Sequence, residues 1–220
     1  DTGTNSLGFY GVSGVFSNSG KIETTGTNNN GVYLKEDTTK GTLKFTNTGN
    51  IIANTEGTVG VYIEKANEFN HDGGVIKTGN GGIGVYNISN PASSNVKIKS
   101  EINIAGSTAT HTGIGVYSNG TGKTIFNTGA KLVLGEKTVG FYSANASNFE
   151  NVFEINNLEA SIGKGSVLAY FGESAIPANN TVNITNATLG NLKVSSMGEN
   201  SAVFYGDKGT TVNINDNINT

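Results

Sequence analysis

Apolar residues recur along the chain in short alternating runs of three to five positions, separated by glycine and asparagine. Such alternation is typical of β-strands with one buried face, and the Gly- and Asn-rich stretches between the runs predict turns. No stretch of useful length has the i, i+3, i+4, i+7 spacing of an amphipathic helix. The pattern therefore predicts an all-β chain of short strands.

The tyrosines divide the chain into repeats. All eight lie in the same local setting, and six of them end a Gly-Val-Tyr or Gly-Phe-Tyr triplet. Successive tyrosines are 23, 29, 24, 31, 25, 28 and 35 residues apart. A disordered chain has no reason to confine every tyrosine to one motif, so the motif excludes disorder. The eight residues are Tyr10, Tyr33, Tyr62, Tyr86, Tyr117, Tyr142, Tyr170 and Tyr205.

A second landmark in each repeat is an apolar residue followed by an Asn- and Gly-rich turn. From this landmark to the next tyrosine the chain takes 17 to 21 residues, whereas from a tyrosine to the next landmark it takes 6 to 14. Length variation is therefore expected mainly at one corner of the repeat, the corner that follows each tyrosine. The landmarks are Phe16, Phe45, Phe69, Ile98, Ile125, Phe153, Ile184 and Ile214.

A right-handed parallel β-helix accommodates this repeat best. Leucine-rich repeats need a regular leucine frame that is absent, and propeller blades need about 40 residues. A β-helix coil needs only three short strands, so residues 1–220 are expected to form one β-helical segment of about eight coils of 23–35 residues. Coils stacked about 4.8 Å apart would give a rod of roughly 35–40 Å.

Equivalent positions of a solenoid stack in columns, so the same residue type recurs once per coil. The residue before each tyrosine and the residue two positions earlier are both predominantly apolar, and we expect both to face inward. The tyrosine and the glycine two positions before it would then face outward. The eight tyrosines are predicted to form a structural ladder that covers the bare glycine backbone.

Asparagine suits the corners of such a coil, because it tolerates the left-handed conformation that a sharp turn requires. Stacked asparagine side chains also hydrogen-bond along the axis. Asn18, Asn47, Asn127 and Asn186 are the expected ladder positions. Neither end of the chain resembles a cap, which predicts that residues 1–220 are an excerpt of a longer chain.

Composition narrows the functional classes. The chain has no Cys, so it can form neither a disulfide nor a Cys-based metal site. Its net charge is −3, and no cluster of lysines would attract a nucleic acid. No apolar run approaches the roughly 20 residues of a membrane span, and no secretion signal opens the chain.

The sequence predicts no catalytic, cofactor-binding or metal site. Glu36 and Asp37 are the closest carboxylate pair, and they are expected on a solvated loop rather than in the paired arrangement of a glycosidase. His71 and His111 are interpreted as plain turn residues without a spaced partner. The glycine-rich run 79–84 is not followed by the helix that a nucleotide-binding loop requires, and it is interpreted as a turn within a coil.

Binding is expected at the variable corner after each tyrosine. Insertions at one position of a stacked repeat align along one edge, and such an edge often contacts partners. Long and short corners nearly alternate, which would leave notches between protrusions; neutral loop drift is the alternative. The outward tyrosines could also pack against sugars, although a purely stabilising ladder is favoured. The predicted partner-binding residues are Lys35, Glu36, Asp37, Asn90, Pro91, Ser93, Ser94, Glu173, Pro177 and Asn179.

The repeats, best seen in residues 44–62 and 124–142, resemble those of large fusobacterial-type autotransporter (type V secretion) adhesins with RadD-like β-helix passengers. The resemblance covers essentially the whole chain, and it weakens in the last two repeats, where Leu168 and Val203 replace the motif glycine. It implies a passenger that is displayed on a Gram-negative bacterium and tethered to the outer membrane by a translocator barrel elsewhere in the full chain. No motif marks the adhesive residues of this family, so the resemblance assigns no binding residue in this chain.

The expected function is that of a non-enzymatic, cell-surface adhesin segment that presents its loops to a host-cell protein, a host glycan or another bacterium. Two alternatives stay open. The segment could be an inert spacer within a larger adhesin, or a β-helical scaffold for a polysaccharide-degrading enzyme or toxin.

Overall fold

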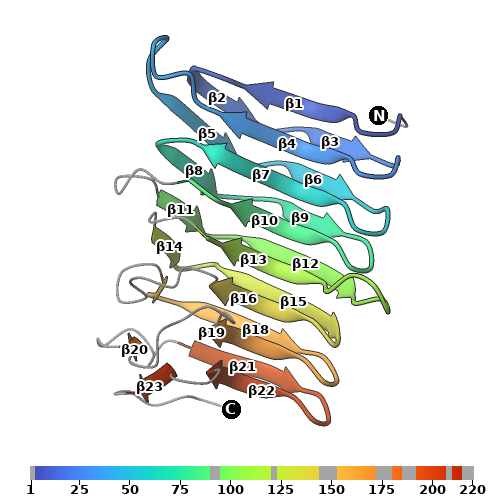
Figure 1. Ribbon diagram of the computed structural model, residues 1–220, viewed down its shortest axis with the longest axis vertical. Helices are drawn as coiled ribbons and strands as arrows, with labels where there is room; N and C mark the ends of the chain where they lie inside the picture. The colour runs from blue at the N-terminus through green and yellow to red at the C-terminus, as the bar shows by residue number, and fades with distance from the viewer. Residues whose placement is uncertain are drawn as a thin grey trace.

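A computed structural model describes residues 3–89, 95–119, 123–143, 153–171, 180–184, 192–206 and 210–214. The described residues form strands, turns and loops, and no helix occurs among them. Strands three places apart in the chain pair in parallel, except β17 and β20, so the strands stack into three long parallel sheets along a rod and a separate two-stranded sheet (Figure 1). The predicted fold class is confirmed: the chain is an all-β parallel solenoid.

Sheet A takes one strand from each tyrosine motif and has eight strands, and we number the coils 1 to 8 by these strands. The strands are β1 (Leu7–Gly11), β4 (Asn30–Lys35), β7 (Val59–Lys65), β10 (Ile83–Asn87), β13 (Ile114–Ser118), β16 (Val139–Ser143), β19 (Val167–Phe171) and β22 (Ala202–Gly206).

Sheet B follows sheet A in coils 1 to 6 and has six strands. They are β2 (Gly14–Asn18), β5 (Leu43–Asn47), β8 (Glu68–His71), β11 (Asn95–Ile98), β14 (Lys123–Phe126) and β17 (Phe153–Ile155). Two further strands, β20 (Asn180–Ile184) and β23 (Thr210–Ile214), pair only with each other.

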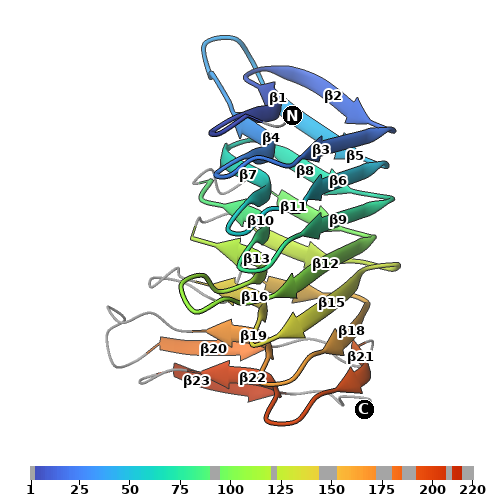
Figure 2. The same ribbon diagram turned by 90° about the vertical axis from the view of Figure 1, so that its right-hand side faces the viewer.

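Sheet C closes each coil and has seven strands (Figure 2). They are β3 (Lys21–Thr24), β6 (Asn50–Ala53), β9 (Val75–Thr78), β12 (Glu101–Gly106), β15 (Lys131–Glu136), β18 (Leu158–Ile162) and β21 (Leu192–Met197). The inward side chains of the three sheets form one continuous apolar core along the axis.

The inward face of sheet A agrees with the sequence prediction at one position and differs at another. In coils 2 to 7 the residue before the tyrosine is buried, as Val61, Val85 and Val116 illustrate with no exposed surface, and in coils 1 and 8 it is partly buried against the core. The residue two positions earlier was predicted to face inward, and this is wrong: Ile83 and its equivalents are partly exposed.

The motif glycine takes the inward place instead. A Cβ on Gly84 would lie 2.6 Å from the carbonyl oxygen of Gly115 in the next coil and 2.7 Å from Cγ2 of Ile102 in sheet C. Gly84 and Val85 are therefore both turned to the core, and strict in–out alternation breaks between them. The physical reason is space: only glycine leaves room for the isoleucine of sheet C and for the neighbouring backbone.

Two of the landmarks in sheet B were also assigned wrongly. The column that begins with Phe16, Phe45 and Phe69 continues through Val96 and Thr124, not through Ile98 and Ile125. Ile98 is also buried, but it lies two residues after Val96, at the next inward position of β11. Ile125 points outward, in register with Lys97 and Glu154.

Asparagine stacking along the axis is confirmed in part. The Nδ2 of Asn18 donates to Oδ1 of Asn47 at 2.7 Å, one coil further on. Asn127 is not in that column, and it accepts a hydrogen bond of 2.9 Å from Asn156. Asn186 lies outside the described residues.

The corner between sheets C and A is built on a left-handed residue two positions before the sheet A strand. This residue has a φ between 56° and 69° in every coil except coil 5, where residues 107–112 form a longer corner. Glycine and asparagine adopt this conformation with little strain, whereas lysine does not. The residues are Asn5, Asn28, Gly57, Gly81, Lys137, Gly165 and Asn200.

Lys137 is the strained member of this set, with a φ of 58°. We expect Lys137→Gly to raise the free energy of unfolding by about 1 kcal/mol, because the left-handed conformation penalises a residue with a Cβ. For a chain of this size, this corresponds to an increase of about 2–4 °C in Tm. Lys131→Gly, within strand β15, is the matched control and should lower Tm. A Lys137→Gly protein no more stable than the wild type would contradict this explanation of the corner.

Candidate functional site

The variable corner that follows each tyrosine lies between sheets A and B. Of the ten residues predicted to bind a partner, Lys35, Glu36 and Asp37 are described, and they lie together at this corner of coil 2. The others fall outside the described residues: Asn90, Pro91, Ser93, Ser94, Glu173, Pro177 and Asn179.

The long corner of coil 2, residues 36–42, folds back over the short corner of coil 1. The backbone N–H of Asp37 donates to the carbonyl of Val12 at 2.8 Å, and the N–H of Gly14 donates to the carbonyl of Thr42 at 2.8 Å. The coil 2 corner therefore covers the short corner before it. Two coils later, the N–H of Ala66 in the short corner of coil 3 donates to Oγ of Ser89 in coil 4 at 3.2 Å.

Asp37 organises the loop from within. Its Oδ1 accepts hydrogen bonds from the backbone and hydroxyl of Thr39, at 3.0 and 2.6 Å, and its Oδ2 lies 3.2 Å from Nζ of Lys40. The hydrogen bonds from Thr39, followed by the Lys40 ammonium, hold the pKa of Asp37 below its ordinary value. Asp37 therefore shapes the corner, and its carboxylate is already occupied by groups of the loop.

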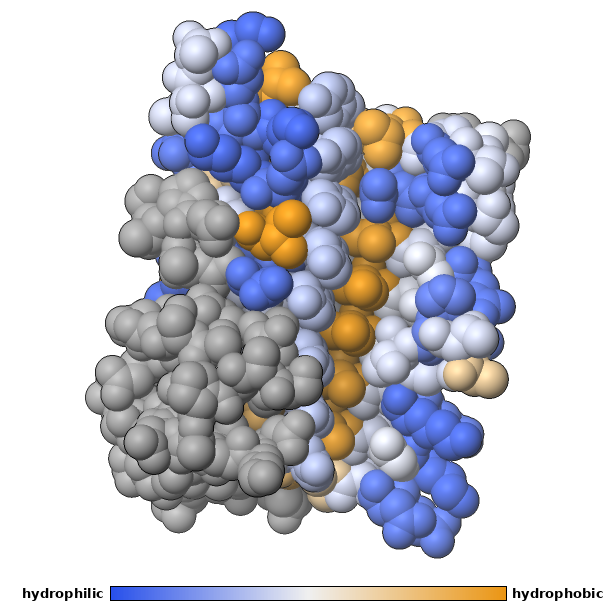
Figure 3. Space-filling model, viewed as in Figure 1, coloured by the Kyte–Doolittle hydropathy of each residue, from blue (hydrophilic) through white to orange (hydrophobic). Residues whose placement is uncertain are grey.

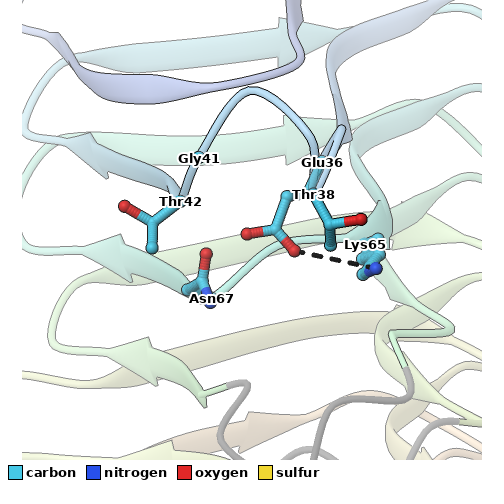
Figure 4. Close-up of a pocket in the computed structure, with 6 residues that line it drawn as sticks. All are labelled: Glu36, Thr38, Gly41, Thr42, Lys65 and Asn67. Carbon is cyan, nitrogen blue, oxygen red and sulfur yellow. Dashed lines mark ion pairs between the residues drawn. The ribbon is translucent and has the colours of Figure 1, made fainter.

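Because the long corner folds toward coil 1, a cavity of about 380 Å³ opens on its other side, above the short corner of coil 3 (Figure 4). Its lining combines a carboxylate, an ammonium group, two hydroxyls and a carboxamide. The lining residues are Glu36, Thr38, Gly41, Thr42, Lys65 and Asn67. Lys65 and Asn67 come from the next coil, and the sequence prediction missed both.

Glu36 is the distinctive group in this cavity, because its side chain is only 5% exposed. Its Oε1 accepts a hydrogen bond of 3.3 Å from the N–H of Leu43, which has a closer acceptor in Oδ1 of Asn67 at 2.9 Å. Its Oε2 lies 3.9 Å from Nζ of Lys65, beyond hydrogen-bonding distance. An ionised carboxylate has about four acceptor positions, so Glu36 keeps capacity for a ligand that donates hydrogen bonds.

A second polar cluster adjoins the cavity where the register of sheet A shifts, between Leu34 and Lys35. Oε1 of Glu64 lies 2.8 Å from Nζ of Lys35, and the Tyr33 hydroxyl donates to Oε2 of Glu64. Hydrogen bonds from Lys35 and then Tyr33 lower the pKa of Glu64. Burial, followed by the bond to Glu64, raises the pKa of Tyr33. Lys35, Tyr33 and Glu64 therefore satisfy one another's charges and hydrogen bonds.

The tyrosines of all eight coils lie in register on the outer face of sheet A, and neighbouring ring centroids are 4.6 to 5.4 Å apart. From Tyr86 to Tyr205 the rings are within 12° of parallel. The stack is interrupted between Tyr33 and Tyr62, whose planes differ by 80°. Stacked rings cover one another's faces, which favours a stabilising ladder over a platform for sugars.

The interpretation of His71 as a plain turn residue is wrong. It is the last residue of β8, it is fully buried, and it continues the Asn18–Asn47 column. Its Nδ1 lies 3.1 Å from Nδ2 of Asn47, and its Nε2 lies 2.9 Å from the carbonyl oxygen of Glu101. Three Asn and His side chains therefore link four successive coils through hydrogen bonds.

His111 lies on the surface, in the longer corner of coil 5. Its ring is beside Gly57, its Cβ and backbone are beside Gly81, and its Nδ1 is 3.4 Å from Oε1 of Glu56. No group of three or more metal-ligating residues occurs within the described part of the chain. Residues 79–82 of the glycine-rich run form the corner between β9 and β10, and residues 83 and 84 begin β10.

Comparisons with protein-family models, with curated proteins and with solved structures found no match to this chain. Among the described residues, no helix is long and apolar enough to cross a membrane.

Proposed function

We propose that this chain is a non-catalytic adhesin segment that is displayed on the surface of a Gram-negative bacterium and contacts a partner through the corner between sheets A and B. In this proposal the solenoid is a stiff support, and it belongs to an autotransporter passenger whose translocator barrel anchors it in the outer membrane. The partner is a protein or glycan of a host cell, or the surface of another bacterium.

One observation carries the proposal: a nearly buried carboxylate with spare acceptor capacity faces an open cavity at a corner whose loop is held by several hydrogen bonds. Burying a carboxylate without short hydrogen bonds is unfavourable, so the spare acceptor positions of Glu36 favour a ligand that donates hydrogen bonds. A rigid loop also loses little conformational entropy on binding, which favours its use for attachment.

The test is attachment of the purified chain to host cells and to bacterial cells, with the cells left intact or treated with protease or glycosidase. We expect saturable binding, and at least a tenfold loss of affinity in a Glu36→Gln, Thr38→Val double variant. The two treatments identify the partner as protein or glycan. Glu199→Gln is the control, because Glu199 pairs with Lys164 at 2.9 Å at another, exposed corner.

Saturable binding that the double variant leaves unchanged would show that the cavity is not the contact. Absence of saturable binding to any of these cells would favour the inert spacer. An enzyme or toxin scaffold would instead require turnover of a polysaccharide or damage to target cells.

A further inference from the structure

The outer face of sheet A carries two uncharged columns that run the length of the rod. One is the tyrosine column. The other, which we call the apolar column, lies three residues before it in each strand, and Figure 3 shows it as a hydrophobic stripe beside the tyrosines. Its members are Leu7, Asn30, Val59, Ile83, Ile114, Val139, Val167 and Ala202. Together the two columns form what we call the front strip.

The other two sheets present a different surface. Outward lysines and glutamates of sheet C pair between coils, as Lys131 does with Glu101 at 3.2 Å. Sheet B has the same kind of pair between Lys97 and Glu68, at 3.5 Å. These faces therefore carry ion pairs between neighbouring coils, whereas the sixteen residues of the front strip include no charge. Apart from Asn30, every member of the apolar column is aliphatic, and an apolar patch on an otherwise charged protein indicates an interface.

We propose that the front strip is a self-association surface, occupied by the front strip of a second copy of this chain. The first reason is periodicity. The strip repeats once per coil, at about 4.8 Å. A partner can contact every coil in the same way only if it has the same repeat, as facing sheets do in stacked β-structures. A second solenoid of this chain meets that requirement along its whole length.

The second reason is shape. A two-fold axis parallel to the rod places each coil opposite the same coil of the second copy, and it sets the tyrosine column of one copy against the apolar column of the other. Tyrosine is longer than valine or isoleucine, so each ridge of tyrosines faces a lower row of aliphatic side chains. The contact is isologous, so it closes at two copies and does not propagate into fibres.

The third reason is size. The strip is roughly 40 Å long and 13 Å wide, or about 500 Å² per copy. Two copies would bury about 1,000 Å², which lies at the lower end for specific interfaces and predicts a reversible dimer. The absence of charge from the strip also removes local repulsion between two copies of a chain whose net charge is −3.

The test is sedimentation equilibrium of the purified chain between about 10 and 500 μM. We expect a monomer–dimer equilibrium, and at least a tenfold weaker association in the Ile114→Lys, Val139→Lys double variant. Val133→Lys is the matched control, because Val133 also points outward from a strand and is half-buried, but it belongs to sheet C. Circular dichroism should show that all the proteins are folded, and Tyr117→Ser provides a second strip variant with no added charge.

Two results would overturn the proposal: a monomer throughout this concentration range, or a dimer that the strip variants leave intact. Orientation has its own test, since the chain has no cysteine. Single cysteines at position 59 and at position 167 should each be joined between copies by a short bis-maleimide. If only a cysteine near the middle of the rod cross-links, the two copies are antiparallel and the proposed two-fold axis is wrong.

Discussion

Adding a single methyl group at Gly84 should destabilise the solenoid by about 2–3 kcal/mol, a cost typical of overpacking a core. The new Cβ would meet backbone, the carbonyl oxygen of Gly115 at 2.6 Å, and the branched end of Ile102 at 2.7 Å. Backbone in a parallel ladder cannot move aside without breaking hydrogen bonds to both neighbours. We therefore expect Gly84→Ala to lower the urea midpoint clearly, with the loss measured by equilibrium unfolding.

Gly20→Ala is the control for this experiment. No atom lies within 4 Å of the position that a Cβ on Gly20 would occupy, and its φ is not in the left-handed region. Its stability should change by less than about 0.5 kcal/mol, as surface substitutions usually do. Equal effects of the two substitutions would mean that the glycines of sheet A do not face the core.

Mild acid should destabilise the chain through His71, and the effect should disappear in His71→Asn. Burial lowers the pKa of His71 below its ordinary value of 6.5, against smaller opposing contributions from Glu101, Asp72 and Asn47. The ring is neutral in the folded state, with Nδ1 accepting from Asn47 and Nε2 donating to the Glu101 carbonyl. A proton on Nδ1 would set two donors against each other.

The direction in which pH changes the stability follows from the linkage between protonation of His71 and folding. Because the pKa of the folded state is the lower one, the stability contribution is complete above pH 6.5 and is lost as the pH falls from there toward the folded pKa. The loss is at most about 1.36 kcal/mol per pH unit, or about 2 kcal/mol between pH 6.5 and pH 5. Carboxylates with lowered pKa, such as Glu64 and Glu154, lose their contribution only below their ordinary value of 4.5.

Urea unfolding at pH 7, 6 and 5 measures this dependence. Asparagine at position 71 extends the Asn18–Asn47 column with an uncharged side chain, so His71→Asn should flatten the profile. His111→Asn makes the same replacement at the surface and is the control for losing a histidine outside the core. A wild-type profile that stays flat down to pH 5 would contradict the assigned hydrogen bonding of His71.

The repeat made the architecture predictable, because a tyrosine that recurs every 23 to 35 residues can align only if the coils stack. The inward position of Val85 followed from the period of a strand. The inward position of Gly84 did not, because period-two reasoning assumes unbroken alternation. What decides it is the isoleucine of sheet C on the opposite side of the core, and that neighbour cannot be read from a single strand.

The candidate site was predictable only in part. Loop length and composition identified residues 35–37, which lie on one segment of the chain. Lys65 and Asn67 join them because the loop of coil 2 folds toward coil 1 and leaves the space beside coil 3 open. The direction in which a corner folds depends on contacts between coils. His71 was misjudged for a similar reason, since its burial follows from its register with Asn47 in the preceding coil.

The backward fold of the coil 2 corner joins coils 1 and 2 into one unit at this end of the described rod, because the corner bonds to Val12 and Gly14 of coil 1. Deleting coil 2 alone would leave the short corner of coil 1 without this cover and its backbone groups without these partners. Loss of coils 1 and 2 together would remove both corners at once, so we expect evolution to gain or lose these two coils as a pair.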